Sequence, residues 1–228
     1  MIQRFFDISF SALAIFLLSP ILLISSIILK LTGNDVLYRQ KRIGLGGNYF
    51  DIYKFTTMVK NSENMGAGTI TLKNDERVLP IGRFLRKSKL NELPQLFNIL
   101  KGDMSVIGPR PQDTKGFNAF HKKEQESIIK VRPGLSGIGS IFFRDEEEIM
   151  DRAEVEDKNK FYIDSISPYK GEIEAWYINH QSIYLYFLLI FLTLYVVISS
   201  NSKVDFQKNF KNFPKLPSEL KNIYQTVA

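Results

Sequence analysis

Residues 8–29 read ISFSALAIFLLSPILLISSIIL, and none of them carries a charge. Arg4 and Asp7 precede this run, and Lys30 follows it. As an α-helix the run would extend about 33 Å, against a bilayer hydrocarbon core of about 30 Å. It is long for the apolar part of a cleavable signal, and no small-residue cleavage site follows it. The run therefore predicts a membrane-embedded helix, with a buried core helix as the alternative.

Ser19 and Pro20 lie at the middle of this run. Proline removes one helical hydrogen bond and clashes with the preceding turn, while a serine hydroxyl can bond the freed carbonyl oxygen. The residues leave two alternatives open, a kinked span and a broken helix that turns back within the membrane. Residues 30–60 carry six basic and two acidic side chains, which favours a cytoplasmic location for the chain after the run.

Composition narrows the classes of function. The chain has 228 residues, a net charge of +6, two His and no Cys. The absence of Cys excludes disulfide scaffolds, thiolate zinc sites and cysteine nucleophiles, and two His argue against a histidine metal cage. The basic residues are scattered and no recognition fold is evident, so no nucleic-acid partner is expected.

The middle of the chain reads as short mixed elements. Residues 38–58 are β-rich and contain three glycines, which predicts a pair of strands. Residues 80–100 have apolar side chains near helical spacing, with Ser88 as a candidate N-cap and Pro94 in a first turn or at a break. Residues 61–74 read as a loop.

The second half is more uneven in composition. Residues 144–157 hold eight acidic side chains, which is typical of a solvated helix face. Residues 183–198 form a second uncharged run, which is short for a membrane span and predicts an interfacial helix. The basic residues after 200 indicate an amphipathic surface segment or a frayed terminus.

Two loops combine arginine with proline. Residues 105–111 read SVIGPRP, and residues 131–134 read VRPG. Proline restricts the backbone beside Arg110 and Arg132, so each guanidinium is presented from a stiff loop. Such a planar fork binds two oxygens of a phosphate or carboxylate with little loss of entropy. The alternative is that both arginines face solvent in ordinary turns.

Residues 91–111, NELPQLFNILKGDMSVIGPRP, closely resemble the signature of the bacterial sugar transferase family, the monotopic phosphoglycosyl transferases. The resemblance extends from Arg4 to about Thr193. Its further segments are residues 4–7 with Ser19–Pro20, 40–44, 53–58, 75–77, 82–87 and 132–137.

The resemblance implies an α/β, α-rich monotopic membrane protein. Its parts would be a re-entrant helix hairpin at residues 1–33, a small catalytic domain with interfacial amphipathic helices at 34–200, and a basic tail at 201–228. The implied reaction moves a phosphosugar from a UDP-sugar to polyprenyl (undecaprenyl) phosphate and releases UMP, as the first step of polysaccharide or glycoconjugate assembly. It would take place among the lipids of the bacterial inner membrane, on the cytoplasmic face. The sequence leaves open whether the chain forms a homodimer.

The resemblance also assigns the site. Mg²⁺ would neutralise the phosphates, with Glu92 as its ligand and as a catalytic residue. The implied phosphate- and substrate-binding side chains are Lys54, Arg86, Arg110, Arg132, Arg144 and Glu174.

One residue departs from the family pattern at its centre. The signature usually begins with Asp-Glu, the Asp acting as nucleophile, and that position is Asn91 here. A carboxamide oxygen is a very weak nucleophile beside a carboxylate. Three alternatives stay open: Glu92 is the nucleophile and Asn91 orients phosphate, the acceptor phosphate attacks directly, or the protein is an impaired scaffold that binds UDP-sugar or prenyl phosphate. A peripheral lipid-binding scaffold without chemistry is a further rival.

Overall fold

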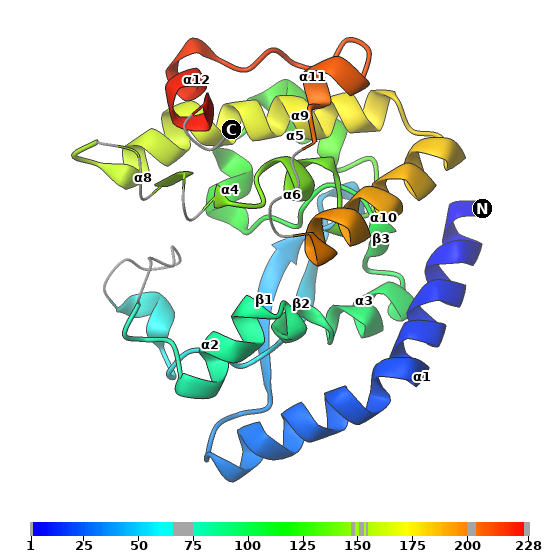
Figure 1. Cartoon of the computed structure of the whole chain (residues 1–228), viewed down its shortest axis with the longest axis vertical. Coiled ribbons are helices and arrows are strands. Elements are labelled where there is room, and N and C mark those ends of the chain that lie inside the picture. The colour runs from blue at the N-terminus through cyan, green and yellow to red at the C-terminus, as the bar shows by residue number, and fades with distance from the viewer. Residues whose placement is uncertain are drawn as a thin grey trace.

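The computed structural model describes residues 2–65, 75–146, 149–150, 153, 155–199 and 204–225 (Figure 1). Its first element is a single long helix, α1 (Ile2–Leu31), which contains the whole uncharged run. Among the described helices α1 alone is long and apolar enough to cross a membrane, and few of its apolar side chains are buried within the chain. This exposed apolar surface indicates membrane association.

The bend in α1 has a local cause. Figure 1 shows two halves of the helix that meet at an angle, and the helix contains one proline, Pro20. Pro20 has no N–H to donate to the carbonyl oxygen of Phe16, four residues earlier. The hydroxyl of Ser19 donates to that same oxygen at 2.8 Å instead. The interruption predicted at these two residues is therefore a bend within one continuous helix.

Polar side chains near its start attach α1 to the rest of the chain. Asp7, only 2% exposed, accepts hydrogen bonds from the Ser105 hydroxyl, the Val106 amide and the Tyr186 hydroxyl, each at 2.9 Å. Arg4 donates to the carbonyl oxygens of Ile99 and Leu100. Because these partners come from three different elements, the helix is held in a defined orientation against the domain.

The predicted strand pair is confirmed. Strands β1 (Leu37–Ile43) and β2 (Tyr49–Phe55) are antiparallel, with Tyr38 opposite Lys54 and Arg42 opposite Phe50. The short 3₁₀ turn η1 (Leu45–Gly47) joins them, and Gly46 and Gly47 have φ of 70° and 78°. Such left-handed backbone favours glycine, which has no Cβ to clash.

A second, smaller sheet brings the two arginine–proline loops together. Strands β3 (Ser105–Ile107) and β4 (Gly134–Ser136) are parallel. The Gly108 amide donates to the Ser136 carbonyl oxygen at 2.9 Å just after β3, and the Gly134 amide donates to the Pro109 carbonyl oxygen at 2.8 Å, which ties the loop of Arg110 to the start of β4. A Cβ on Gly134 would lie 2.1 Å from the backbone nitrogen of Gly108, so this close approach requires glycine.

The region predicted as one helix over residues 80–100 is three elements. Helix α2 (Pro80–Lys87) is followed by the 3₁₀ turn η3 (Leu90–Glu92) and by α3 (Gln95–Lys101). The prediction that Ser88 is an N-cap is wrong, because Ser88 ends α2 and its hydroxyl donates back to the Phe84 carbonyl oxygen. Lys89 has a left-handed φ of 59°, which turns the chain between the two segments.

The remaining described elements build the main hydrophobic core. They are α4 (Thr114–Asn118), α5 (Lys122–Ile128), α6 (Ile138–Phe142), α8 (Lys158–Phe161), the π-helical turn η4 (Tyr162–Ile166), α9 (Ser167–Asn179), α10 (Ile183–Ile198), α11 (Phe206–Asn209) and α12 (Ser218–Gln225). Helix α10 has the bounds predicted from the sequence. Phe206, Phe213 and Leu220, within the segment expected as a tail, are buried in the same core as α9 and α10. Much of residues 61–74 and 144–157 lies outside the described residues.

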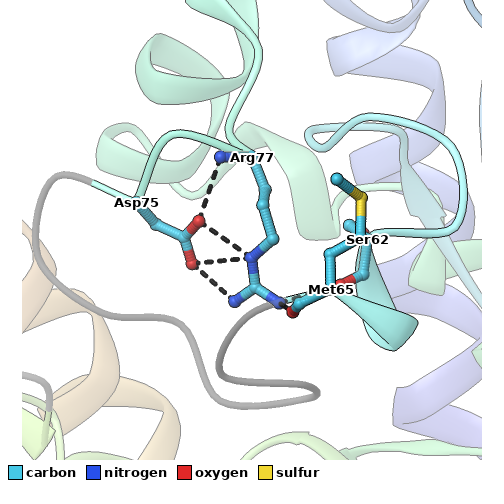
Figure 2. Close-up of polar contacts among 4 residues, drawn as sticks. All are labelled: Ser62, Met65, Asp75 and Arg77. Carbon is cyan, nitrogen blue, oxygen red and sulfur yellow. Dashed lines mark hydrogen bonds and ion pairs between the residues drawn. The ribbon is translucent and has the colours of Figure 1, made fainter.

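An ion pair between Arg77 and Asp75 lies next to residues 66–74 in the chain. Arg77, 8% exposed, donates from Nε and Nη2 to both carboxylate oxygens of Asp75, at 2.6 to 3.1 Å. Its Nη1 donates to the carbonyl oxygens of Ser62 and Met65 at 2.8 and 2.6 Å, as Figure 2 shows. Arg77 thereby links the segments before and after residues 66–74.

Candidate active site

Three charged side chains from separate elements meet on the inner side of the β1–β2 pair. Lys54 lies at the end of β2, Glu92 ends η3, and Arg110 follows β3. Nζ of Lys54 is 3.0 Å from Oε1 of Glu92, and Nη2 of Arg110 is 3.8 Å from the same oxygen. The side chains of Lys54 and Glu92 are each 21% exposed, and that of Arg110 is 45% exposed. The group is therefore partly desolvated yet open on the side of Arg110.

The electrostatics of this group follow from that packing. Burial alone would raise the pKa of Glu92, but Lys54 and Arg110 outweigh it and lower the pKa to about 2. Burial lowers the pKa of Lys54, and Glu92 partly offsets this effect. Glu92 is therefore ionised at neutral pH, and one carboxylate faces two cations.

Arg42 is a further cation of the site that the sequence motifs did not single out. It lies on β1, on the same face of the strand pair as Lys54, as the register of the two strands requires. Nη1 of Arg42 is 3.9 Å from Oδ2 of Asp113, and burial lowers the pKa of Arg42, with a smaller contribution from Arg110 in the same direction. The predicted strand pair did not identify Arg42, because the side chains of β1 that share a face with Lys54 depend on the register of the two strands.

Asn91 precedes Glu92 in η3 and is 9% exposed. Its Oδ1 is buried and accepts no hydrogen bond within the described part of the chain. A buried amide oxygen without a partner costs about 1 to 3 kcal/mol. Such an atom is typical of a site that a ligand completes.

Glu174 lies under the Arg110 loop and makes no described ion pair with it. Its side chain comes from α9, and Oε1 accepts a hydrogen bond from the backbone N–H of Arg110 at 3.1 Å. Glu174 is 4% exposed, and burial raises its pKa to about 7 against the opposing effects of Arg110 and Lys170. The structure thus places Glu174 against the backbone of the Arg110 loop.

A second buried charge lies one turn before Glu174 on α9. Nζ of Lys170, a residue only 6% exposed, contacts Oε1 of Glu146 and donates to the Tyr162 hydroxyl. Burial opposes the charge of Lys170, but Glu146 and Tyr162 outweigh it and raise the pKa. The sequence pattern placed Glu146 in a solvated acidic run and gave no sign of Lys170, because nothing in the local pattern marks their contact.

Arg132 and Arg144, also selected from the sequence, contact other parts of the chain, whereas Arg86 lies on a helix next to the turn that carries Glu92. Nε of Arg132 donates to the Gly102 carbonyl oxygen at 2.8 Å, beyond the end of α3. Arg144 contacts Asp145 and the Ser199 carbonyl oxygen at the end of α10. Arg86 lies in the last turn of α2, which packs on the turn that carries Glu92.

The residues present suit a magnesium ion. The described residues contain no group of three or more His, Asp or Glu side chains that could form an all-protein metal cage. Mg²⁺ is commonly held by one or two carboxylates, with substrate phosphates and water completing its octahedron. Glu92 supplies such a carboxylate, and Asn91, the preceding residue, has a buried Oδ1 that accepts no hydrogen bond from the described residues.

Comparison with known proteins gives consistent matches. The family model described as bacterial sugar transferase matches residues 1–200. A UDP-N-acetylgalactosamine-undecaprenyl-phosphate N-acetylgalactosaminephosphotransferase of Aeromonas hydrophila is 34% identical over 201 residues, which cover 87% of this chain and 44% of that protein. A UDP-glucose:undecaprenyl-phosphate glucose-1-phosphate transferase of Klebsiella pneumoniae is 35% identical over 204 residues, covering 85% and 39%.

A third relative has a different sugar in its name. An undecaprenyl-phosphate galactose phosphotransferase of Salmonella typhimurium is 29% identical over 211 residues, which cover 86% of this chain and 40% of that protein. The chain spans about two fifths of the length of these curated relatives. The segment that each of these relatives has in common with this chain therefore covers most of this chain.

Proposed function

The chain belongs to the bacterial sugar transferase family, and from this premise we propose that it transfers a phosphosugar from a UDP-sugar to polyprenyl phosphate, with release of UMP. The relatives named above act on undecaprenyl phosphate and carry different sugars. Their names support the class of acceptor and the class of reaction. They support the transferase over a scaffold that only binds the same ligands.

The observation that carries the proposal is the meeting of Lys54, Glu92 and Arg110 beside α1. Leu29, in the last turns of α1, is buried against Phe55 and Leu85, and Leu90 packs on the same cluster. Phe55 directly follows Lys54, and Leu90 lies two residues before Glu92. The charged group is therefore next to the apolar helix, where a phosphate on a lipid would lie.

The charges suit two phosphorylated substrates. Lys54 and Arg110 contact Glu92, and Arg42 contacts Asp113, so these three cations exceed the two carboxylates they contact. Such an excess stabilises a diphosphate and the charge that develops on phosphoryl transfer. Mg²⁺, held by Glu92 with Asn91 beside it, would neutralise further phosphate charge when bound.

The proposed reaction is a single displacement at phosphorus. An oxygen of the acceptor phosphate forms a bond to the sugar-bearing phosphorus, the bond from that phosphorus to the bridging oxygen breaks, and UMP leaves with the bridging oxygen. The pKa of Glu92, about 2, and its two cationic neighbours make this carboxylate a weak nucleophile. These features support a role for Glu92 in holding positively charged groups. The attacking group would then be the acceptor phosphate.

We also propose that α1 is a re-entrant membrane helix, with the catalytic domain on the cytoplasmic face of the inner membrane. The bend at Ser19–Pro20 would let the helix enter and leave one leaflet. Arg4 and Lys30 near its two ends would then both lie at the headgroup level.

The experiment is a panel of UDP-sugars, incubated with the full chain in detergent or liposomes, polyprenyl phosphate and Mg²⁺. We expect UMP from at least one donor, a glycosylated lipid diphosphate, and no UMP without acceptor. Rapid UMP release without acceptor, in an amount equal to the enzyme, would show a covalent enzyme intermediate instead. The Asn91→Asp variant distinguishes the scaffold from the proposed transferase. A scaffold would have almost no turnover as wild type and would gain turnover with the substitution. The proposed transferase is active without it.

A further inference from the structure

The loop that presents Arg110 has an unusual backbone. In the sequence Pro109–Arg110–Pro111, only the central residue has a backbone N–H, because proline has none. Oε1 of Glu174 accepts a hydrogen bond from that single N–H at 3.1 Å. The carboxylate therefore takes the one backbone donor that this tripeptide offers.

The placement of Glu174 is costly for the fold. The residue is 4% exposed, and its Oε2 has no hydrogen-bond partner in the described part of the chain. A buried acid with an unpaired oxygen destabilises the folded state relative to a well-packed apolar residue. Burial raises the pKa of this carboxyl to about 7, which is a direct expression of that cost. A contribution to packing alone does not account for an acid here.

The residues around Glu174 leave little space beside its carboxylate. A Cβ on Gly139 of α6 would lie 2.4 Å from Oε1 of Glu174, so any larger residue at this position would displace the carboxylate from its place. One turn further along α9, the hydroxyl of Tyr177 donates to the Ile107 carbonyl oxygen at 3.4 Å. The loop from β3 to Arg110 is thus held by α9 at two points.

We propose that Glu174 is a positioning residue, which holds the backbone of Arg110 so that its guanidinium faces Glu92 and the substrate phosphates. This inference rests on the proposed function and reassigns Glu174, which the family resemblance placed among the substrate-binding residues. Arg110 contacts substrate, and Glu174 acts only through Arg110.

Three substitutions at this position separate positioning from packing. Glu174→Gln keeps an oxygen acceptor with the same reach, so we expect kcat/KM within about threefold of wild type. Glu174→Asp is one methylene shorter and Glu174→Ala has no acceptor, so we expect losses of about 10- to 100-fold, because misplacement by about 1 Å can cost that much. Glu172→Gln, an exposed acid two residues away on α9, is the matched control.

A double-mutant cycle tests the route through Arg110. If Glu174 acts only through Arg110, adding Glu174→Ala to Arg110→Ala should lower kcat/KM by less than about twofold further, although each single change costs much more. Multiplicative losses would overturn the proposal. So would equal losses in the Gln and Asp variants when both melt at the wild-type temperature.

A readout that needs no turnover keeps this proposal distinct from the proposed function. Hydrogen exchange in the full chain should be faster at the Arg110 amide in Glu174→Ala, and unchanged in Glu174→Gln and Glu172→Gln. Unchanged exchange in Glu174→Ala would overturn the positioning role, even for an active enzyme. If the wild type transfers no phosphosugar but this exchange pattern is found, the proposed function fails while the hydrogen bond to the Arg110 loop stands.

Discussion

The Arg77–Asp75 and Arg110–Glu92 contacts both join an arginine to a carboxylate, with opposite results. Arg77 is 8% exposed, and its donors are distributed over both oxygens of Asp75 and two backbone carbonyls. Arg110 is 45% exposed in its side chain and lies 3.8 Å from a Glu92 oxygen that Lys54 already contacts. The Arg77 group has its charge balanced and its hydrogen bonds made, whereas the Glu92 group has an excess of cations.

This difference separates a structural ion pair from a binding site. A guanidinium that is fully paired has little to offer a ligand, but it is costly to remove. A half-exposed guanidinium beside a shared carboxylate gains its best partners when a phosphate arrives. The two groups should therefore respond to substitution in opposite ways, one in stability and the other in activity.

The largest effect is expected at Glu92. Glu92→Gln removes the negative charge that orders Lys54 and Arg110, together with the proposed metal ligand, and we expect the rate of UMP release to fall by about 1,000-fold or more. Glu76→Gln, an exposed acid beside Arg77, is the control and should retain the wild-type rate. Near-normal turnover in a folded Glu92→Gln variant would remove Glu92 from the centre of the site.

A crossed comparison of the two arginines should give the next largest effect. Arg110→Ala should lower kcat/KM by about 100-fold with little change in melting temperature, because the side chain is half exposed. Arg77→Ala removes the guanidinium from the largely buried carboxylate of Asp75 and should destabilise the fold by about 3 kcal/mol. The Arg77→Ala molecules that remain folded should have the wild-type kcat/KM.

Arg77→Lys provides a milder version if the alanine variant does not fold. It keeps the charge but loses the fork, so a smaller loss of stability is expected, again with normal turnover. A loss of kcat/KM in this variant without a loss of stability would place Arg77 in the active site.

A pH-dependent effect on stability is expected at Glu174. The folded chain binds this proton more tightly than the unfolded chain, because burial raises the pKa from 4.5 to about 7. Stability should therefore fall by about 3 kcal/mol as pH rises from about 4.5 to 7, and change little above that. Glu174→Gln should remove this component, so its melting temperature relative to wild type should rise across that range. A constant difference between the two proteins would show that Glu174 has an ordinary pKa.

Local patterns in the sequence predicted much of the fold and part of the site. The uncharged run gave α1, the β-rich stretch gave the strand pair, and residues 183–198 are α10. A break between α2 and α3 was expected only as an alternative at Pro94, and the turn at the left-handed Lys89 was missed because it interrupts an otherwise helical pattern. Helix propensity and the spacing of apolar residues report on residues that are close in the chain. They do not show where a single residue with a left-handed backbone turns the chain.

Contacts between distant elements were harder to predict. Lys54, Glu92 and Arg110 were selected from motifs, and the structure brings them together. Arg42 and Lys170 were missed, since their roles depend on strand register and on a contact between α9 and Glu146. Arg132 was selected for the same reason as Arg110, yet it contacts the Gly102 carbonyl oxygen. An arginine–proline turn thus indicates a stiff loop but not the direction of its guanidinium.

The most direct test of the central claim is the identity of the nucleotide released together with the lipid product. Wild-type chain, a UDP-sugar, polyprenyl phosphate and Mg²⁺ should give UMP and a lipid diphosphate sugar in equal amounts, and Glu92→Gln should give neither. Release of UDP with a lipid monophosphate sugar would mean that the bond to the sugar breaks instead of the bond between the phosphates. That result, or equal products from both proteins, would contradict the account.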